Sequence, residues 1–367
     1  MASPPPIHSK RFRKLFSLAA IFLVTMSCCT QFALAARKVS TGAAHDKAMR
    51  ERYEKWIAEH GRTYKDSAEK ARRFQVFKSN AHLIDSYNAA AGPGGKSRPG
   101  LTTNNFADLT EAEFNNIYIR RRPRPRPPPI VVGTGFMYGN MGLSDVPASI
   151  DWREKGAVTT IKNQGSCGCC WAFSAAVAVE GIHQIRTQKL VSLSVQQLVD
   201  CSTGENNRGC NLGDMDEAFR YIVHSGGITT DKAYGYEAQQ GTCRSSGKKA
   251  AAKIRNFQYV LPGNETALLL AVAHQPVSIA LDGSNTAFRF FAGAGIFGAD
   301  GQQCTTDLNH AVTAVGYGTD ENGTKYWLIK NSWGSDWGDN GYVKIARDVA
   351  SNGGLCGLAM QASYPVA

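Results

Sequence analysis

The stretch "QGSCGCCWAF", Gln164–Phe173, places three cysteines within four positions and continues into a run of small and apolar residues. The continuation "CWAFSAAVAVEGIHQIR" is small or apolar on almost every side, which predicts a helix buried in a core. A cysteine at the start of such a helix lies at its positive end, where the thiolate is favoured over the thiol. Cys170 has this position, whereas Cys167 lies in a glycine-rich turn and is better placed to form a bridge.

A nucleophilic thiol needs a base or imidazolium partner, and that partner needs a third group to orient it. The segment "LNHAVTAVGYG" supplies His310 at the head of a β-rich run, and "KNSWGSDWG" supplies Asn331 at the end of another. Each is weak evidence alone, because a single histidine is more often structural and Asn before Ser commonly marks a turn. With Cys170 they form a candidate group for nucleophilic catalysis.

The chain from Val146 to Ala367 has the composition of a folded domain, with balanced charge, many glycines and eight of the ten cysteines. Helices are expected at 170–186, 195–200 and 214–225. Short β-rich runs separated by glycines follow, at 276–281, 310–318, 325–333 and 341–347. The first lobe is therefore expected to be mainly helical and the second mainly β.

Residues 46–90 are predicted to form two helices, the first ending at Gly61 and the second covering 67–88. Spacings of three and four residues place six side chains on one face of the second helix: Glu69, Arg73, Phe77, Asn80, Ile84 and Asn88. An ordinary amphipathic helix explains the two apolar members but not the charged and amide ones. Beyond it, "RRRPRPRPPP" at 120–129 predicts an extended, exposed linker, although such runs also serve as ligands of aromatic-lined grooves.

The first residues have the organisation of a secretory signal. Basic residues precede the 12-residue apolar run at 15–26, and small residues follow it, with cleavage expected after Ala35 or Ala36. The run is too short to span a bilayer comfortably, which disfavours the alternative of a membrane anchor. Cys28 and Cys29 leave with the signal. The other eight cysteines are then exposed to an oxidising compartment, where bridges are expected.

The net charge of +11 is confined to the front of the chain. Residues 1–145 hold 23 lysines and arginines against 11 acids, whereas 146–367 hold 18 against 19. Binding of nucleic acid by the C-terminal part is therefore disfavoured, because it needs clustered positive charge. Asn264 in "NET" and Asn322 in "NGT" fit the acceptor pattern for N-glycosylation.

Taken together, these motifs resemble the papain family of cysteine protease precursors, close to plant vacuolar members and cathepsin L. The resemblance rests on "QGSCGCCWAF", "NHAVTAVGYG", "KNSWGSDWG" and the six-residue helix face, in the family's order. It implies an α+β, two-lobed papain-like fold, with a helical left lobe, an antiparallel β-barrel right lobe and a helical inhibitory prosegment in front. The implied domains are a signal peptide at 1–36, a propeptide at 37–145 and a peptidase domain at 146–367.

The resemblance also implies roles for residues of the site. Cys170 is the nucleophile, His310 its partner, Asn331 orients the imidazole, and Gln164 donates to the oxyanion together with the Cys170 N–H. Trp333 shields the His–Asn contact from water. The implied substrate-binding residues are Leu212, Gly213, Asp214, Met215, Ala280, Leu308, Gln361 and Trp333.

Six cysteines allow fifteen connectivities, so the pairing rests on the resemblance. It implies three bridges: Cys167–Cys210, Cys201–Cys243 and Cys304–Cys356. Cys170 is then free because it reacts, and Cys169 is interpreted as a free thiol without a catalytic role, or as an oxidation liability beside the nucleophile. No metal and no cofactor are expected.

Three positions depart from the family pattern. Thr102 stands where the prosegment usually has Gly, and Leu212 where a wall beside the substrate backbone usually has Gly. Val195 replaces a Glu that usually joins an interlobe charge cluster, whose other members are Lys162, Glu180 and Lys330. Losing this acid is expected to loosen the lobe contact or to shift its pH dependence.

The function implied is a secretory-pathway cysteine endopeptidase, made as an inactive zymogen and acting through an acyl-enzyme. Expected partners are protein and peptide substrates, the chain's own propeptide and cystatin-type inhibitors. A monomer is expected, in a vacuole- or lysosome-like compartment or outside the cell. One alternative is a catalytically silent papain-like storage or binding protein, although such relatives typically lose the nucleophile. Another is a zinc protein, which the cysteine spacing disfavours.

Overall fold

The computed structural model describes residues 44–90, 99–119, 136–204, 206–293, 295–301, 304–351 and 353–367. The predicted signal peptide at 1–36 and the Arg/Pro linker at 120–129 lie outside these residues. The chain divides into two compact units, Met1–Phe74 and Gln75–Ala367. Within the part of the chain that the structure describes, no helix is long and apolar enough to cross a membrane.

The first unit contains a helix over residues 44–59 and the beginning of α2 (Ser67–Ala89). Asp66 starts α2, because its Oδ1 accepts a hydrogen bond from the Glu69 N–H at 2.7 Å. The rings of Tyr53 and Phe74 lie 5.3 Å apart and hold the two helices together. The Arg73 Nε donates to Glu69 Oε1 at 3.3 Å, which explains two charged members of the predicted helix face.

The second unit begins with the remainder of α2 and continues into α3 (Glu111–Tyr118). Asn80 Nδ2 donates to the carbonyl of Ala107 at 2.8 Å, and Asn88 exchanges two hydrogen bonds of 2.9 Å with the backbone of Leu101. The amide side chains on the helix face therefore fasten the turn-rich segment 101–109, while Phe77 and Ile84 on the same face are buried. Both predicted N-terminal helices are confirmed; α3 was not predicted.

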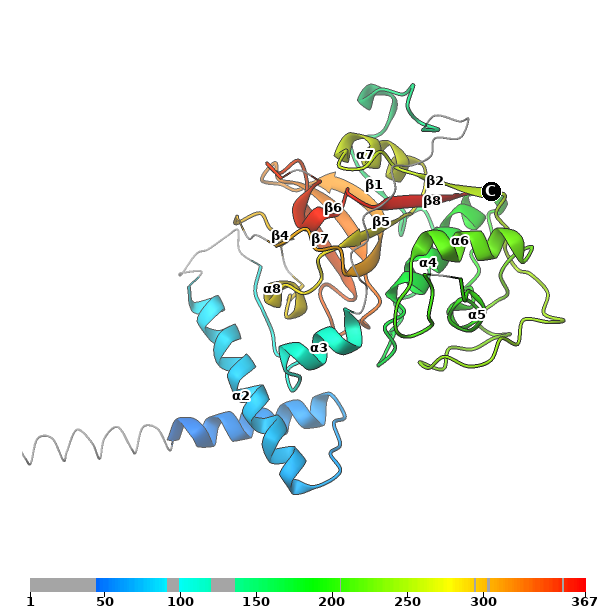
Figure 1. Cartoon of the computed structure of the whole chain (residues 1–367). Helices are drawn as coiled ribbons and strands as arrows, with labels where there is room; N and C mark the ends of the chain where they lie inside the picture. Colours follow the sequence, from blue (N-terminus) through cyan, green and yellow to red (C-terminus); the bar gives the residue numbers. More distant parts are fainter. Residues whose placement is uncertain are drawn as a thin grey trace, which may run out of the picture. The chain divides into compact units, whose positions relative to one another are not determined.

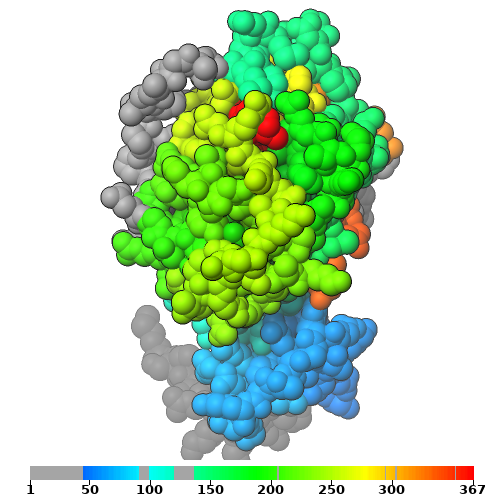
Figure 2. Space-filling model, turned by 90° about the vertical axis from the view of Figure 1, so that its right-hand side faces the viewer, coloured from blue at the N-terminus to red at the C-terminus, as the bar shows by residue number. Residues whose placement is uncertain are grey.

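Three helices form one lobe of the second unit: α4 (Cys170–Thr187), α5 (Val195–Cys201) and α6 (Met215–His224). They gather on one side of Figure 1, and α4 is buried over its first 13 residues. Ser194 begins α5 by accepting from the Gln197 N–H at 2.9 Å. The connections around these helices, coloured green to yellow, make up most of the face seen in Figure 2.

The other lobe is an eight-stranded sheet in the order β2-β8-β3-β5-β6-β7-β4, with β1 also paired to β5. All of its pairs are antiparallel except β4 with β7. Its strands are β1 (Ile150–Asp151), β2 (Asn256–Tyr259), β3 (Val277–Leu281), β4 (Ile296–Phe297), β5 (His310–Thr319), β6 (Lys325–Lys330), β7 (Tyr342–Ala346) and β8 (Ala362–Val366). Its helical segments are α7 (Glu265–His274), α8 (Thr286–Arg289) and η2 (Leu355–Gly357), and η1 (Leu143–Asp145) precedes β1.

The two lobes meet where α4 packs on β3 and β5 (Figure 1). Ser174 lies at this contact: its Oγ donates to the Val312 carbonyl at 2.7 Å, and its own carbonyl accepts from Ser278 Oγ at 3.0 Å. These buried hydrogen bonds fix the start of α4 relative to the start of β5. The residues that begin those two elements are Cys170 and His310.

The main elements predicted from the sequence are present: α4, α5 and α6 in one lobe, and β3, β5, β6 and β7 in the other. The helix α7 was missed because its residues are apolar on almost every side and carry no 3.6-residue pattern. One local signal was available, since Asn264 precedes it and caps it by accepting from the Ala267 N–H at 2.8 Å.

Candidate active site

Cys170 is the first residue of α4 and is buried beneath the lobe contact. The N–H of Ala311, the second residue of β5, donates to the Cys170 sulfur at 3.4 Å. The thiol therefore lies at the positive end of a long helix and at the head of the strand that begins with His310. Both features favour the thiolate over the thiol.

His310 is held by an amide and an indole. Its Nε2 lies 2.9 Å from Asn331 Oδ1, and that oxygen also accepts from the Ser332 N–H at 2.8 Å. Because Oδ1 is an acceptor in both contacts, Nε2 carries a hydrogen and donates it. The Trp333 ring stacks on the imidazole, with centroids 4.5 Å apart. The orientation of the ring is thus fixed from one edge and one face.

Gln164 is fixed through its backbone and its side chain. Its N–H donates to Ser332 O at 2.8 Å, its Oε1 accepts from Ser332 Oγ at 2.8 Å, and its carbonyl accepts from Tyr236 Oη at 2.7 Å. Its Nε2 donates to the carbonyl of Cys167 at 2.9 Å. The amide is therefore buried in one orientation beside the residues that lead to the thiol.

The structure joins Cys167 to Cys210, Cys201 to Cys243 and Cys304 to Cys356, the pairs that the resemblance implies. Among the described cysteines, only Cys169 and Cys170 form no disulfide. Burial raises the pKa of Cys169 well above its ordinary value. Cys169 is therefore held as a neutral thiol.

Comparison with known proteins yields two family matches. The model described as "Papain family cysteine protease" matches residues 146–366, and the one described as "Cathepsin propeptide inhibitor domain" matches residues 53–114. The chain belongs to the papain family. A senescence-specific cysteine protease of Oryza sativa subsp. japonica is 47% identical over 340 residues, which are 93% of this chain and 96% of that protein. Vignain of Ricinus communis is 48% identical over 319 residues, 86% of this chain and 85% of vignain.

Solved structures of papain-family precursors have the same fold. The recombinant stem bromelain precursor gives a TM-score of 0.78 at 41% identity, covering 87% of this chain and 99% of that one. The proform of the ragweed pollen allergen Amb a 11 gives 0.78 at 40% identity, covering 87% and 95%. The predicted papain-like fold and the predicted class of enzyme, a cysteine protease with an inhibitory propeptide, are confirmed. The relatives named above are proteases, which contradicts the silent-protein alternative.

The candidate substrate-binding residues of this papain-family chain fall into two groups. Asp214 Oδ1 accepts from Gln361 Nε2 at 3.3 Å, and the Gln361 carbonyl accepts from the Ala280 N–H at 2.9 Å. Met215, Ala280 and Leu308 pack in the same apolar cluster. Gly213 packs so closely on the Trp171 indole that a Cβ there would overlap the ring. Leu212 is partly exposed beside it.

Sequence reasoning missed Arg289, a buried cation at the end of α8 that holds the propeptide. Its guanidinium donates to the carbonyls of Phe106 and Leu109, each at 2.6 Å, and its own carbonyl accepts from Asn104 Nδ2 at 2.8 Å. Burial lowers the pKa of Arg289 to about 10, although Glu111, Asp108 and Glu113 of the propeptide oppose the shift. A basic residue within the apolar run "FRFF" was the available signal.

The propeptide also reaches the catalytic indole and imidazole. Phe106 and Phe114 each lie 5.4 Å from Trp333, centroid to centroid, in edge-to-face contacts. Gly283 separates Ile119 from His310, since a Cβ at Gly283 would lie 2.7 Å from His310 Cβ and 3.1 Å from Ile119 Cδ1. The propeptide therefore covers the imidazole side of the site.

Around Val195, the two lysines of the expected interlobe charge cluster bond to groups other than Glu180. Lys162 Nζ pairs with Asp231 Oδ2 at 2.8 Å, and Lys330 Nζ donates to the Thr159 carbonyl at 2.7 Å. Burial raises the pKa of Glu180 and lowers that of Lys330 to about 8. Val195 lines a small, partly open pocket of about 20 Å³, together with Lys162, Glu180 and Lys330. A pocket of this size has room for a water molecule.

Proposed function

We propose that this papain-family protein is a secretory-pathway cysteine endopeptidase in which Cys170 attacks the peptide carbonyl and His310 transfers the protons. The observation that carries the proposal is the junction of α4 and β5, which places a helix-start thiol beside the strand that begins with a histidine. Attack forms a C–S bond, and His310 protonates the departing amine as the C–N bond breaks. Water, deprotonated by His310, then hydrolyses the thioester and restores the thiol.

Asn331 and Trp333 define which nitrogen of His310 does this work. Nε2 is committed to Asn331 Oδ1, so the proton is exchanged through Nδ1. Trp333 is fully buried and stacked on the ring, which keeps water from the His–Asn hydrogen bond. Thiolate and imidazolium share one proton, so their titration belongs to the pair.

Gln164 and the Cys170 N–H are proposed as the oxyanion donors. One hydrogen of Gln164 Nε2 is given to Cys167, and the second is available for the developing negative charge. On the substrate side, Gly213 pairs with the substrate backbone and Leu212 lies beside the third residue upstream of the scissile bond. The pocket for the second upstream residue is formed by Asp214, Met215, Ala280, Leu308 and Gln361.

Residues 37–145 are proposed as the propeptide that blocks the site, and 146–367 as the mature enzyme. Three propeptide acids, Asp108, Glu111 and Glu113, surround the buried charge of Arg289. Protonating them removes attraction that neutral pH maintains, so acid loosens the propeptide. Cleavage is placed between Arg120 and Asp145. Within this span the Tyr138 ring stacks on His274, with centroids 4.2 Å apart.

The proposed compartment is supported by the predicted signal and by the three disulfides, which are typical of an oxidising route. A vacuole- or lysosome-like compartment and the cell exterior share that route. Asn264 and Asn322 are exposed and are proposed as glycosylation sites. The Asn264 side chain, whose amide nitrogen would carry the sugar, also caps α7 through its oxygen. Cystatin-type inhibitors and a monomeric state are proposed as well.

The decisive experiment replaces each of the two adjacent thiols. Cys170→Ala should abolish hydrolysis of peptides while the precursor still folds, and Cys169→Ser should retain most activity. Mass spectrometry of acid-matured protein labelled with an epoxide inhibitor should find the label on Cys170 and report the mature N-terminus. Appreciable hydrolysis by pure Cys170→Ala protein, or labelling of Cys169, would contradict the proposal.

A further inference from the structure

We infer that Tyr236 is a positioning residue of the oxyanion hole, and that Cys169 acts through it. The inference rests on the proposed roles of Gln164 and of the Cys170 N–H. Its basis is one phenol oxygen that contacts both segments of the oxyanion hole. Tyr236 Oη lies 2.7 Å from the carbonyl of Gln164 and 3.0 Å from the sulfur of Cys169, the residue before the nucleophile.

The direction of these hydrogen bonds is determined by the atoms involved. A carbonyl oxygen accepts only, so the single phenol proton of Tyr236 is donated to Gln164. The sulfur of Cys169 must then donate its own hydrogen to the phenol oxygen. Burial raises the pKa of both Cys169 and Tyr236, so neither loses its proton near neutrality. The result is a directed chain from the Cys169 S–H through the Tyr236 O–H to the Gln164 carbonyl.

Tyr236 thereby links the two proposed donors of the oxyanion hole. Gln164 supplies the side-chain amide, and Cys169 is joined by one peptide bond to the donating N–H of Cys170. The separation of the two donors depends on the loop between them, which a bridge from Cys167 to Cys210 also restrains. The phenol holds the two ends of this loop at a fixed distance. The ring itself packs edge-to-face on Phe173, with centroids 5.0 Å apart.

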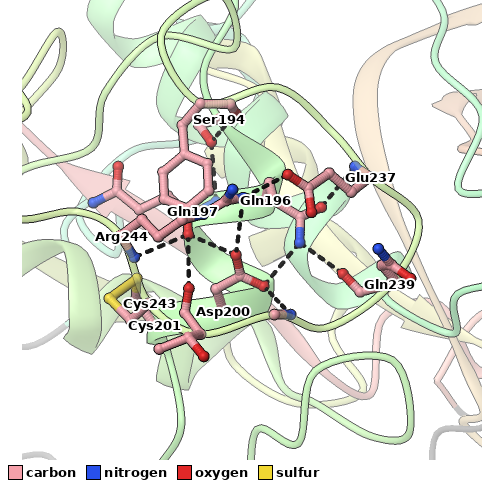
Figure 3. Close-up of polar contacts among 12 residues, drawn as sticks. Ser194, Gln196, Gln197, Asp200, Cys201, Glu237, Gln239, Cys243 and Arg244 are labelled. Atoms are coloured by element: carbon pink, nitrogen blue, oxygen red, sulfur yellow. Dashed lines mark hydrogen bonds and ion pairs between the residues drawn. A yellow bond between two sulfur atoms is a disulfide. The ribbon is translucent and has the colours of Figure 1, made fainter.

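The segment that carries Tyr236 is anchored on α5 by a buried carboxylate (Figure 3). Asp200 accepts from Gln196 Nε2 at 2.8 Å, from the Gly241 N–H at 2.7 Å and from Tyr234 Oη at 2.6 Å. Gln196 also accepts from the Glu237 N–H at 2.8 Å. The neighbours of Tyr236 on both sides are thus fixed, and the Cys201–Cys243 bridge closes the segment. Tyr236 therefore cannot follow a displaced loop.

A positioning role predicts a specific kinetic signature. Negative charge develops on the substrate oxygen only in the transition state and in the tetrahedral intermediate. Loss of the Tyr236 hydroxyl should therefore lower kcat and leave KM unchanged. Removing an oxyanion donor outright costs 100-fold or more, and displacing one through a lost support should cost about tenfold. Alkylation of Cys170 by iodoacetamide forms no oxyanion and should be unaffected.

The experiment compares mature enzyme carrying Tyr236→Phe with wild type and with Tyr221→Phe. Tyr221 is a matched control, because its hydroxyl accepts from Gln197 Nε2 at 3.0 Å in the same lobe, away from the site. The expected result for Tyr236→Phe is a loss of about tenfold in kcat and in affinity for a peptide aldehyde, whose adduct carries the oxyanion. KM, the pH profile and the iodoacetamide rate should stay within twofold of wild type, roughly the scatter of a neutral substitution.

Two variants of Cys169 complete the test. Cys169→Ala removes the donor behind the phenol and should lower kcat severalfold, whereas Cys169→Ser keeps a donor and should restore most of it. Unchanged kcat and aldehyde affinity in Tyr236→Phe would overturn the inference, as would equal losses in kcat and alkylation. Failure of the proposed function is distinct, because wild-type enzyme itself would then hydrolyse no peptide.

Discussion

The two sides of the nucleophile are held by different kinds of contact: hydrogen bonds on the thiol side and aromatic rings on the imidazole side. On the thiol side, Gln164 and Cys169 are held by Tyr236 and, behind it, by the hydrogen bonds around Asp200 (Figure 3). On the imidazole side, Trp333 is enclosed by aromatic rings from both the peptidase domain and the propeptide. The first side is complete within the mature domain. The second is completed by residues that leave on maturation.

The kind of contact on each side matches whether that side must persist in the mature enzyme or includes a segment that is removed. Directional hydrogen bonds among buried groups define one geometry and are costly to break, as a permanent oxyanion hole requires. Aromatic contacts are larger in area but less directional, so a removable segment can contribute to them and depart without leaving buried polar groups unsatisfied on the enzyme. Arg289 is the exception, because departure of the propeptide releases its guanidinium from the carbonyls of Phe106 and Leu109.

The largest expected effect is the weaker binding of the propeptide when Phe114, its buried ring on the imidazole side, is replaced by alanine. Phe114 is fully buried between Phe106, Tyr118 and Trp333, and the Arg289 guanidinium lies 4.7 Å from its ring centre. Phe114→Ala should weaken the hold of the propeptide by about 3 kcal/mol, or roughly a hundredfold. The measurement is the rate at which an epoxide inhibitor alkylates Cys170 in uncleaved precursor at neutral pH.

The mature enzyme provides the control for Phe114→Ala, since the altered residue has been removed from it. Its kcat and KM should equal those of wild type. If the uncleaved variant stayed as slow to alkylate as wild-type precursor, the aromatic contacts would not be what keeps the zymogen latent.

On the thiol side, Asp200→Ala should destabilise both the precursor and the mature enzyme. Asp200 is buried, and Asp200→Ala leaves the Tyr234 hydroxyl, the Gln196 amide and the Gly241 N–H without their acceptor. The expected loss is about 3 kcal/mol in the free energy of unfolding, of precursor and mature enzyme alike. Denaturant titration measures it, with Asp307→Ala at an exposed site as the control. A loss confined to the precursor would erase the contrast between the two sides.

A smaller effect is expected at the lobe contact, where Val195 replaces an acid. The pKa of Lys330 is about 8 in the folded protein and returns to its ordinary value near 10.5 on unfolding. Between these pH values the unfolded state binds more protons, so stability rises with pH. Val195→Glu places a carboxylate in the same pocket, which raises the pKa of Lys330 and flattens the rise.

Val195→Glu should reduce the rise of the free energy of unfolding with pH by roughly 1 to 2 kcal/mol, since one pKa unit corresponds to about 1.4 kcal/mol. It is measured as the difference between the free energies of unfolding at pH 8 and pH 10, using mature enzyme blocked at Cys170. Val195→Gln is the matched control, with the same shape and no charge. An equal flattening by both variants would show that volume rather than charge controls this contact.

The sequence alone identifies some residues of the two sides but not others. Cys170, His310 and Asn331 begin or follow regular elements, so local pattern identifies them. The roles of Arg289 and Tyr236 are not visible locally, because they arise from partners 183 and 72 positions away in the chain. Asp200 lies in the last turn of a short helix, and nothing local indicates that it will accept hydrogen bonds from three donors. Likewise, the six-residue face of α2 was visible from spacing, but the carbonyls that its asparagines bind were not.

The smallest expected effect lies outside both sides, on the wall where Leu212 replaces glycine. Leu212 is partly exposed, and its carbonyl accepts from the Arg208 N–H at 2.8 Å, which holds its backbone in place. Its side chain therefore offers a fixed apolar contact to the third residue upstream of the scissile bond. Such a contact should favour large apolar residues by roughly 1 kcal/mol, or about fivefold in kcat/KM.

The test is a peptide series with Gly, Val, Leu or Phe in the third upstream position and the first two positions held constant. Wild type should prefer Leu and Phe over Gly about fivefold, and Leu212→Gly should lose this preference. Hydrolysis of a peptide that ends at the second upstream residue serves as the control, because it cannot reach the leucine and should be equal in both enzymes. Identical ranking and spacing of the four peptides would show that Leu212 does not shape specificity. The peptide with Gly in the third position distinguishes two effects of Leu212→Gly. If the variant only loses the leucine contact, this peptide is hydrolysed at the wild-type rate, whereas a shifted wall slows every peptide in the series.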